Sequence, residues 1–164
     1  MSAFTISPAI DLRFGKVVRL SQGQGDRQTV YGDDPASTAQ SWITQGAEWL
    51  HVVNLNGAFG EATAQNESAI ENIVAAAKNK AKVQLGGGIR ELDHIEKAFA
   101  LGVTRVVLGT AVIENPSFGI EAISSFGAQK IAFGFDALED ELMSRGWKSH
   151  SGQSMLALAQ TLKE

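Results

Sequence analysis

The sequence predicts an α/β fold made of about five βα units. Three glycines, Gly46, Gly102 and Gly127, each end a segment with helical spacing and are followed within a few residues by a short apolar run. A glycine in this place is typical of a helix that ends in the left-handed conformation. Because helix and strand alternate, we expect a parallel sheet with right-handed crossovers.

The expected strands are short runs rich in β-branched or aromatic residues, as strands buried on both faces usually are. In chain order they are Phe4–Ile10, Trp49–Val53, Lys82–Leu85, Arg105–Leu108 and Ile131–Phe135. Each is expected to be followed by a helix that returns the chain to the start of the next strand.

The segments between strands repeat apolar residues at three- and four-residue spacing, which places them on one helix face. The residues concerned are Ala36, Ala39 and Ile43; Leu92, Ile95, Ala98 and Phe99; and Ile120, Ile123 and Phe126. A last helix is expected at Ser154–Leu162. Asp34 and Asn115, each followed by proline, and Ser151 are the candidate N-caps.

Five βα units fit two architectures, an open doubly wound sheet or an arc of a (βα)8 barrel. The chain has 164 residues, and because a whole barrel takes about 250, length favours the open sheet. In both architectures the ligand binds at the carboxyl ends of the strands. The candidate functional residues are therefore those that follow each apolar run.

Composition excludes several classes of function. The chain has no cysteine, which excludes a disulfide scaffold, a zinc–thiolate site and a thiol nucleophile. A formal net charge of -4 argues against nucleic acid or an anionic membrane as partner. Because no stretch approaches the ~20 apolar residues of a membrane span, and no cationic leader pattern opens the chain, we expect a cytoplasmic protein.

Glycines follow two neighbouring strands. Gly86, Gly87 and Gly88 lie between an apolar run and a helix start with Arg90, and Gly109 and Thr110 follow the next strand. Free N–H groups at such turns, with an arginine, favour a phosphate site. The alternative is that the glycines only permit a tight turn and that Arg90 is solvated. Two such loops side by side favour phosphate.

Two aspartates follow apolar runs, Asp11 after the first expected strand and Asp136 after the fifth. A carboxylate at the mouth of a dry strand layer can have a raised pKa, and two such groups can serve as base and acid. The alternative is that each carboxylate caps a neighbouring loop by accepting backbone hydrogen bonds. The residues alone leave both open.

The remaining candidates carry weaker signals. His51 lies within an expected strand, either as a core histidine or facing the barrel mouth, and the three histidines show no metal-ligand spacing, so no metal site is expected. Trp147 lies in a polar segment, where it either covers a flat ligand ring or packs over the end of the sheet.

Several motifs resemble, in order and spacing, the phosphoribosylformimino-aminoimidazole carboxamide ribotide isomerases of histidine biosynthesis. They are PAIDLRFGKVVRLSQG (8–23), YGDDPASTAQSWITQGAEWLHVVNLNGA (31–58), VQLGGGIR (83–90), GVTRVVLGTAVIENP (102–116) and RGWKSHSG (145–152). The resemblance implies a (βα)8 TIM-type barrel, here a single partial barrel over residues 1–164. It also implies a sugar substrate phosphorylated at both ends and an Amadori aldose–ketose rearrangement without a cofactor.

The resemblance also implies roles for individual residues. Asp11 matches the general base, and Asp136 matches the general acid or partner carboxylate. Three further positions match residues that hold the substrate, and five match one phosphate site. The substrate-holding positions are Arg19, Arg90 and Trp147, and the phosphate-site positions are Gly86, Gly87, Gly88, Gly109 and Thr110.

The chain departs from this family in two ways. Asn54 and Asn56 stand where members commonly carry aspartate, which we expect to change the pKa near Asp11. The chain also stops at Glu164, whereas members continue through three more strands with a further acid candidate and a second phosphate site. Five units cannot close an eight-stranded barrel. We therefore expect exposed edges at strands one and five, and either self-association or a complementing carboxyl-terminal chain.

A second function class stays open at this stage. If the missing strands are indispensable, the chain is a phosphosugar-binding half-barrel without turnover.

Overall fold

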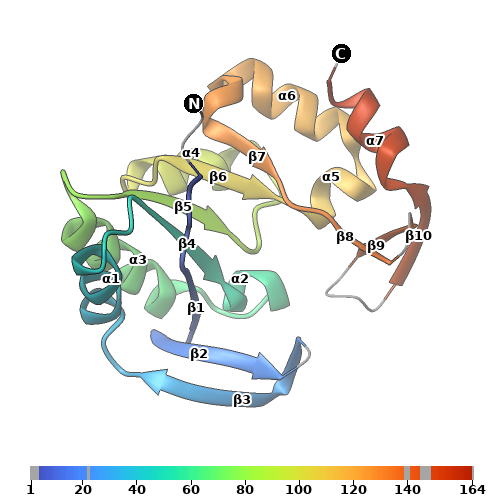
Figure 1. The fold of residues 1–164 in the computed structure, drawn as a ribbon. Coiled ribbons are helices and arrows are strands. Elements are labelled where there is room, and N and C mark those ends of the chain that lie inside the picture. The colour runs from blue at the N-terminus through green and yellow to red at the C-terminus, as the bar shows by residue number, and fades with distance from the viewer. Residues whose placement is uncertain (1–3, 22, 139–140, 145–148, 164) are drawn as a thin grey trace.

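The computed structural model describes residues 4–21, 23–138, 141–144 and 149–163 (Figure 1). Its main sheet has seven strands in the order β3-β2-β1-β4-β5-β6-β7. Five of them are parallel neighbours: β1 (Ala9–Arg13), β4 (Trp49–Asn54), β5 (Lys82–Gly86), β6 (Arg105–Leu108) and β7 (Ile131–Phe133). The last four confirm the expected strands to within two residues. The parallel sheet with helices outside it is the partial (βα)8-type barrel that the resemblance implied.

The expected first strand, Phe4–Ile10, was wrong. Phe4 and Ile6 are 91% and 69% exposed, and the strand is β1, in which Ile10 and Leu12 are buried while Asp11 between them faces the other side. This half-polar alternation is not an apolar run, so the strand could not be found by looking for one. Asp11 therefore lies inside a strand and not after it.

A hairpin of β2 (Lys16–Ser21) and β3 (Gln24–Gly32) was not expected. β2 pairs antiparallel with β1, and β3 pairs with β2. The prediction that strand one exposes an edge is therefore wrong, since β3 is the outer strand on that side. β7 is the outer strand on the other side, as expected for the fifth strand.

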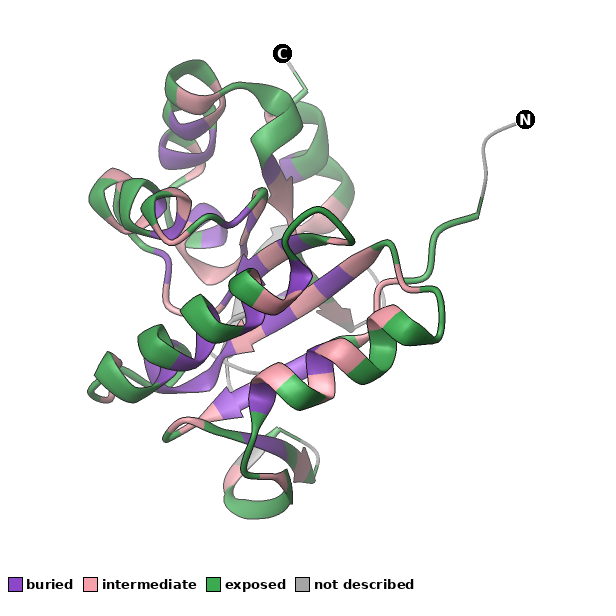
Figure 2. Ribbon diagram, turned by 90° about the vertical axis from the view of Figure 1, so that its left-hand side faces the viewer, coloured by how far each residue is buried: buried purple, intermediate pink, exposed green. Residues whose placement is uncertain are grey.

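The helices of the βα units pack on the outer face of the sheet (Figure 1, Figure 2). They are α1 (Pro35–Thr44), α3 (Ala64–Ala77), α4 (Leu92–Ala100) and α6 (Pro116–Phe126), of which α3 had not been located in the sequence. Asp34 caps α1 by accepting the Ser37 N–H at 3.1 Å. Gly46, Gly102 and Gly127 have φ of 96°, 93° and 90°, which confirms the left-handed backbone expected after α1, α4 and α6.

Short elements lie at the carboxyl ends of the strands. α2 (Leu55–Phe59) follows β4 and α5 (Thr110–Glu114) follows β6, whereas the 3-10 turn η1 (Ala128–Lys130) lies at the amino end of β7. After β7 the chain forms a second, antiparallel sheet of β8 (Asp136–Leu138), β9 (Glu141–Ser144) and β10 (Ser149–Ser154). α7 (Met155–Thr161) ends the fold, and its cap is Ser154, whereas the expected cap, Ser151, lies in β10.

The two faces of the main sheet are chemically different. Side chains toward the helices are apolar and fully buried, among them Ile10, Leu50, Val52, Val106 and Leu108. The opposite, concave face carries half-buried residues, including Asp11, His51 and Arg105. The apolar layer holds the fold together, and the concave face is left for polar groups. In the described part of the chain, every helix is too short or too polar to cross a membrane.

Candidate functional site

Asp11 lies in a row of small apolar side chains on the concave face. The strand register aligns Asp11 with Val53, Gly86, Val107 and Ala132 on the four following strands. These neighbours offer little polar solvation, and burial raises the pKa of the Asp11 carboxyl, an effect that the charges of His51 and Arg19 partly offset. The row therefore combines a proton-accepting group with small neighbouring side chains.

The next row, one step deeper, is polar. Register aligns His51 of β4 with Gln84 of β5 and Gln84 with Arg105 of β6. Gln84 Nε2 lies 3.0 Å from His51 Nδ1, and Arg105 Nε donates to Gln84 Oε1 at 3.0 Å. The Arg105 guanidinium lies over the Trp49 ring, 4.4 Å from its centroid. His51 is thus a half-buried histidine of the barrel interior with a defined partner.

The glycine loops after β5 and β6 line one cavity of about 570 Å³. Four of the predicted phosphate-site positions contribute to it, together with Arg90. They are Gly87, Gly88, Gly109 and Thr110, while Gly86 lies in β5 beside the cavity. The Arg90 side chain is exposed and its Nη2 donates to the Ala58 carbonyl at 3.3 Å. Two loops that are 20 residues apart in the chain thus share one wall.

The triple glycine also has a structural reason. Gly87 and Gly88 have φ of 96° and 80°, and a Cβ on Gly88 would lie 2.4 Å from the Gly57 carbonyl carbon. A Cβ on Gly87 would lie 2.3 Å from the Asn54 carbonyl oxygen. These two glycines therefore let the β5–α4 loop pack directly on the last residue of β4 and on α2. A tight turn and a cavity of the size of a small-molecule site coexist at this loop.

The start of α4 differs from the expected anion site. The helix begins at Leu92, after Arg90, and its N-cap is Glu91, with Asp93 in the first turn. The Arg90 N–H donates to His94 Nδ1 at 3.2 Å. Because acidic side chains already surround these N–H groups, the loop glycines and Arg90 are better anion ligands here than the α4 dipole is.

A second cavity of about 580 Å³ lies between α3 and α4, on the other side of the same loop. Several of its polar side chains already have side-chain partners. Thr63 Oγ1 donates to Glu67 Oε1 at 2.6 Å, and Lys97 Nζ lies 2.7 Å from Asp93 Oδ2. We therefore assign the candidate phosphate site to the cavity beside Gly109 and Thr110.

The structure does not group all the expected residues. Asp136 follows β7 after two residues, as expected, but it is exposed and opens the second sheet, so it is not in a position matching that of Asp11. Arg19 is exposed on β2, and its positive charge acts to lower the pKa of Asp11. Trp147 lies outside the described residues.

Asn54 and Asn56 do not lie where the sequence placed them. Both are buried behind the sheet with Asn66 of α3, at 8%, 1% and 0% exposure, and not at the mouth beside Asp11. Asn66 Nδ2 donates to Asn54 Oδ1 at 2.8 Å, to Asn56 Oδ1 at 2.9 Å and to the Leu12 carbonyl at 2.9 Å. The groups that act on the pKa of Asp11 are His51 and Arg19. The placement of Asn54 and Asn56 at the mouth is therefore wrong, while the effect on the pKa of Asp11 of replacing aspartate there stays a prediction.

These three asparagines, the asparagine cluster, hold the turn between β1 and β2. Asn56 Oδ1 accepts the Phe14 N–H and Asn66 Oδ1 accepts the Gly15 N–H, both at 2.8 Å. Phe14 and Gly15 have φ of 50° and 75°, and a bulky residue with positive φ is strained. The cluster was missed because its partners are 42 to 54 residues apart. Its signal in the sequence is amide side chains within otherwise apolar segments.

The chain matches the family model described as histidine biosynthesis protein over residues 5–164. Curated relatives include 1-(5-phosphoribosyl)-5-((5-phosphoribosylamino)methylideneamino) imidazole-4-carboxamide isomerases. Those of a Polaromonas species, Cupriavidus taiwanensis and Polynucleobacter asymbioticus are 42%, 43% and 42% identical over 96% of the chain. The chain spans 63%, 62% and 61% of their lengths. It belongs to the histidine biosynthesis protein family.

Proposed function

We propose that this chain catalyses an aldose–ketose isomerisation of a phosphorylated aminosugar, the conversion of ProFAR to PRFAR in histidine biosynthesis. The relatives are named isomerases of a compound with two phosphoribosyl groups. The observation that carries the proposal is Asp11, a carboxylate with raised pKa inside a row of small side chains. Asp11 lies on the same sheet as the glycine loops, which line a cavity of about 570 Å³.

In the proposed reaction, an acid protonates the ring oxygen of the aminoaldose, and the nitrogen lone pair opens the ring to a protonated imine. Asp11 then removes the C2′ proton, which leaves an enolamine. The enolamine takes up a proton at C1′ and loses the hydrogen of its C2′ hydroxyl, which becomes the ketone, so that protons and electrons balance without a cofactor. A base of raised pKa suits this step because it holds the abstracted proton better than an ordinary carboxylate.

We propose Asp136 as the acid or partner carboxylate. Its support is its place at the carboxyl end of β7, the end at which ligands bind in parallel-stranded barrels. Arg19 and Trp147 are proposed to hold the substrate, with Arg19 also acting on Asp11 through its charge.

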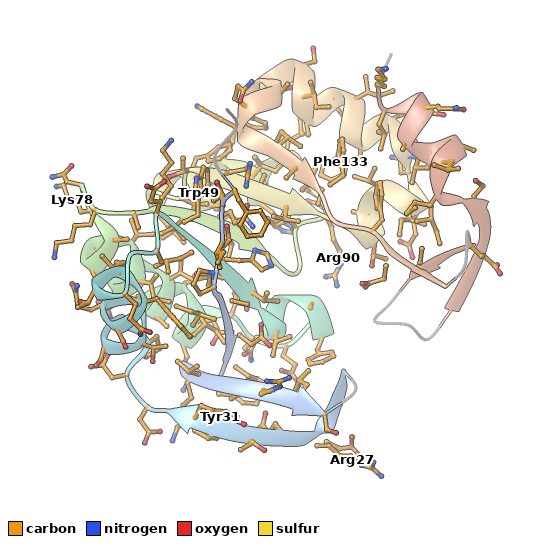
Figure 3. The ribbon with its side chains drawn as sticks, in the orientation of Figure 1. Arg27, Tyr31, Trp49, Lys78, Arg90 and Phe133 are labelled. Carbon is orange, nitrogen blue, oxygen red and sulfur yellow. The ribbon has the colours of Figure 1, made fainter. Side chains whose placement is uncertain are left out.

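For the phosphate, we propose the cavity lined by Gly87, Gly88, Gly109 and Thr110, with Arg90 at its wall. Titration with ribose 5-phosphate, followed by amide NMR shifts, tests this assignment. Arg90→Gln is expected to weaken binding about tenfold, because a charge-assisted contact is lost. Arg27→Gln is the control, since Arg27 lies on β3, well away from Arg90 (Figure 3). Equal weakening by both variants, or shifts far from these loops, would contradict the assignment.

Turnover decides the function. The purified chain is mixed with the aminoaldose and the ketose is measured by chromatography, with the same chain carrying Asp11→Asn in parallel. Ketose formed by the unmodified chain and not by the variant supports the isomerase. If the chain binds ribose 5-phosphate but forms no ketose, the isomerase proposal fails. The chain is then a half-barrel that binds phosphosugars without turnover.

We also propose that the outer strands β3 and β7 lead the chain to associate, either with itself or with a complementing carboxyl-terminal chain. Sedimentation velocity tests this association. A monomer that melts cooperatively and does not bind an added carboxyl-terminal segment of a relative would contradict it.

We also propose a cytoplasmic location for the chain, and cell fractionation checks it.

A further inference from the structure

The polar row below Asp11 restricts how His51 can carry its hydrogen. Arg105 is a donor only, and its Nε and Nη2 both donate to the side-chain oxygen of Gln84. The Gln84 oxygen must therefore face Arg105, which turns the Gln84 NH2 group toward His51. That NH2 group lies 3.0 Å from His51 Nδ1.

Two donors cannot share a hydrogen bond, so His51 Nδ1 must accept and carry no hydrogen. In the neutral ring the hydrogen then sits on Nε2. Arg105 is itself fixed, since its guanidinium lies 4.4 Å from the centroid of the Trp49 ring. The Trp49 ring holds the Arg105 guanidinium, and Arg105 orients the Gln84 amide through its donors. The amide in turn fixes which nitrogen of His51 accepts.

The His51 ring lies toward the carboxyl ends of the strands. A Cβ placed on Gly86 would lie 3.6 Å from His51 Cε1. Gly86 is two residues beyond Gln84 on β5 and stands in the row of Asp11. Cε1, the ring carbon bonded to Nε2, therefore lies close to the row in which Asp11 lies.

We propose that Gln84 and Arg105 are positioning residues that hold neutral His51 with its hydrogen on Nε2, so that His51 donates a hydrogen bond toward the Asp11 row. The donor serves the Asp11 carboxylate or an oxygen of the bound sugar. The catalytic consequence of this arrangement rests on the proposed isomerase function. The tautomer itself does not.

The surrounding charges agree with a neutral imidazole. The groups acting on His51 are Asp11 of β1, which favours its protonation, and Arg105 of β6, which opposes it. Burial has the largest effect and lowers the pKa of His51. A proton added at Nδ1 would also displace the Gln84 hydrogen bond. His51 is therefore a hydrogen-bond donor at neutral pH and not a cation.

Nitrogen-15 NMR of labelled histidine measures the tautomer directly, because a protonated and an unprotonated ring nitrogen differ widely in shift. The His51 signals are those lost in His51→Gln. We expect Nδ1 unprotonated and Nε2 protonated in the unmodified chain at neutral pH. Nδ1 protonated in that spectrum would overturn the proposal without any variant.

Two variants test the cause. Gln84→Glu keeps an acceptor for Arg105 but offers His51 only oxygen, so we expect the hydrogen to move to Nδ1. Arg105→Met frees the amide to rotate, so we expect both tautomers. Lys82→Met is the matched control. Lys82 Nζ also lies over the Trp49 ring, 5.3 Å from its centroid, but Lys82 is two residues before Gln84 and outside the row of His51. An unchanged tautomer in folded Gln84→Glu, or a shift in Lys82→Met, would overturn the proposal.

Kinetics then separate this inference from the function. If the chain is an isomerase, Gln84→Glu is expected to lower kcat about tenfold with KM within about twofold, since a positioned donor is lost while the phosphate site is untouched. If no turnover is found in any variant but the tautomers behave as described, the proposed function fails and the positioning of His51 stands.

Discussion

Asp11 and Asp136 lie in unlike parts of the molecule. Asp11 is inside β1, between β2 and β4 in the seven-stranded sheet, half-buried among small apolar side chains. Asp136 is exposed and begins the separate sheet of β8–β10. Because the Asp11 carboxylate is desolvated within the sheet, its protonation is coupled to the free energy of unfolding. Asp136 is exposed instead, and the following predictions test this difference between the two residues.

The largest effect is expected for Asp11→Asn. An amide cannot take the C2′ proton, so kcat should fall on the order of 10³-fold, while binding of ribose 5-phosphate stays within about twofold. A steady-state assay with a binding titration checks both. Asp33→Asn is the control, as Asp33 is 78% exposed and pairs with Lys16, and its turnover should not change. A loss below tenfold in Asp11→Asn would remove Asp11 as the base.

Next in size is the effect of Asn66→Ala behind the sheet that holds Asp11. The change leaves the Gly15 N–H without its acceptor and takes a donor from Asn54, Asn56 and the Leu12 carbonyl. We expect a loss of about 2–4 kcal/mol in the free energy of unfolding, because these groups are buried. Denaturant unfolding measures it.

Two variants serve as controls for Asn66→Ala, one outside the asparagine cluster and one within it. Asn115→Ala removes an exposed amide that makes no capping hydrogen bond, so we expect a change below about 0.5 kcal/mol. Asn56 Nδ2 is buried without a hydrogen-bond partner in the described part of the chain. Asn56→Asp keeps the oxygen that accepts from Phe14 and removes this orphan NH2 group, so it should cost much less than Asn66→Ala. Equal losses in all three variants would show that the cluster does not hold the turn.

A smaller effect is expected for Asp136→Asn. Loss of a general acid should lower kcat about 10²-fold. Because Asp136 is exposed, the free energy of unfolding should stay within about 0.5 kcal/mol of the unmodified chain. Kinetics and denaturant unfolding of the same preparation check the two statements. Destabilisation as large as that of Asn66→Ala would mean that Asp11 and Asp136 do not differ as described.

The sequence predicted the parts of this site that depend on neighbours in the chain. The turns after β5 and β6 follow from glycines next to apolar runs, and they do line one cavity. The helix ends at Gly46 and Gly102 follow from the backbone freedom of one residue. Such features need no knowledge of the rest of the fold.

The missed features depend on distant partners. β1 was misplaced because Asp11 and Arg13 interrupt its apolar pattern, and only the burial of Ile10 and Leu12 against the helices shows which face is which. Asn54 and Asn56 were placed at the mouth because they follow a strand, although their partner Asn66 draws them behind the sheet. The link from Arg105 to His51 likewise depends on the register of three strands. No local pattern encodes such a register.

The smallest expected effect is a pH dependence of stability that arises from Asp11. Burial raises the pKa of Asp11 in the folded chain above its ordinary value of 3.8. At pH values between 3.8 and the folded pKa, the folded state therefore binds more protons than the unfolded state. Stability is therefore full below pH 3.8 and falls as pH rises through the folded pKa. Asp11→Asn lacks this loss, so it should be more stable than the unmodified chain at pH 7 and lose that advantage below pH 4.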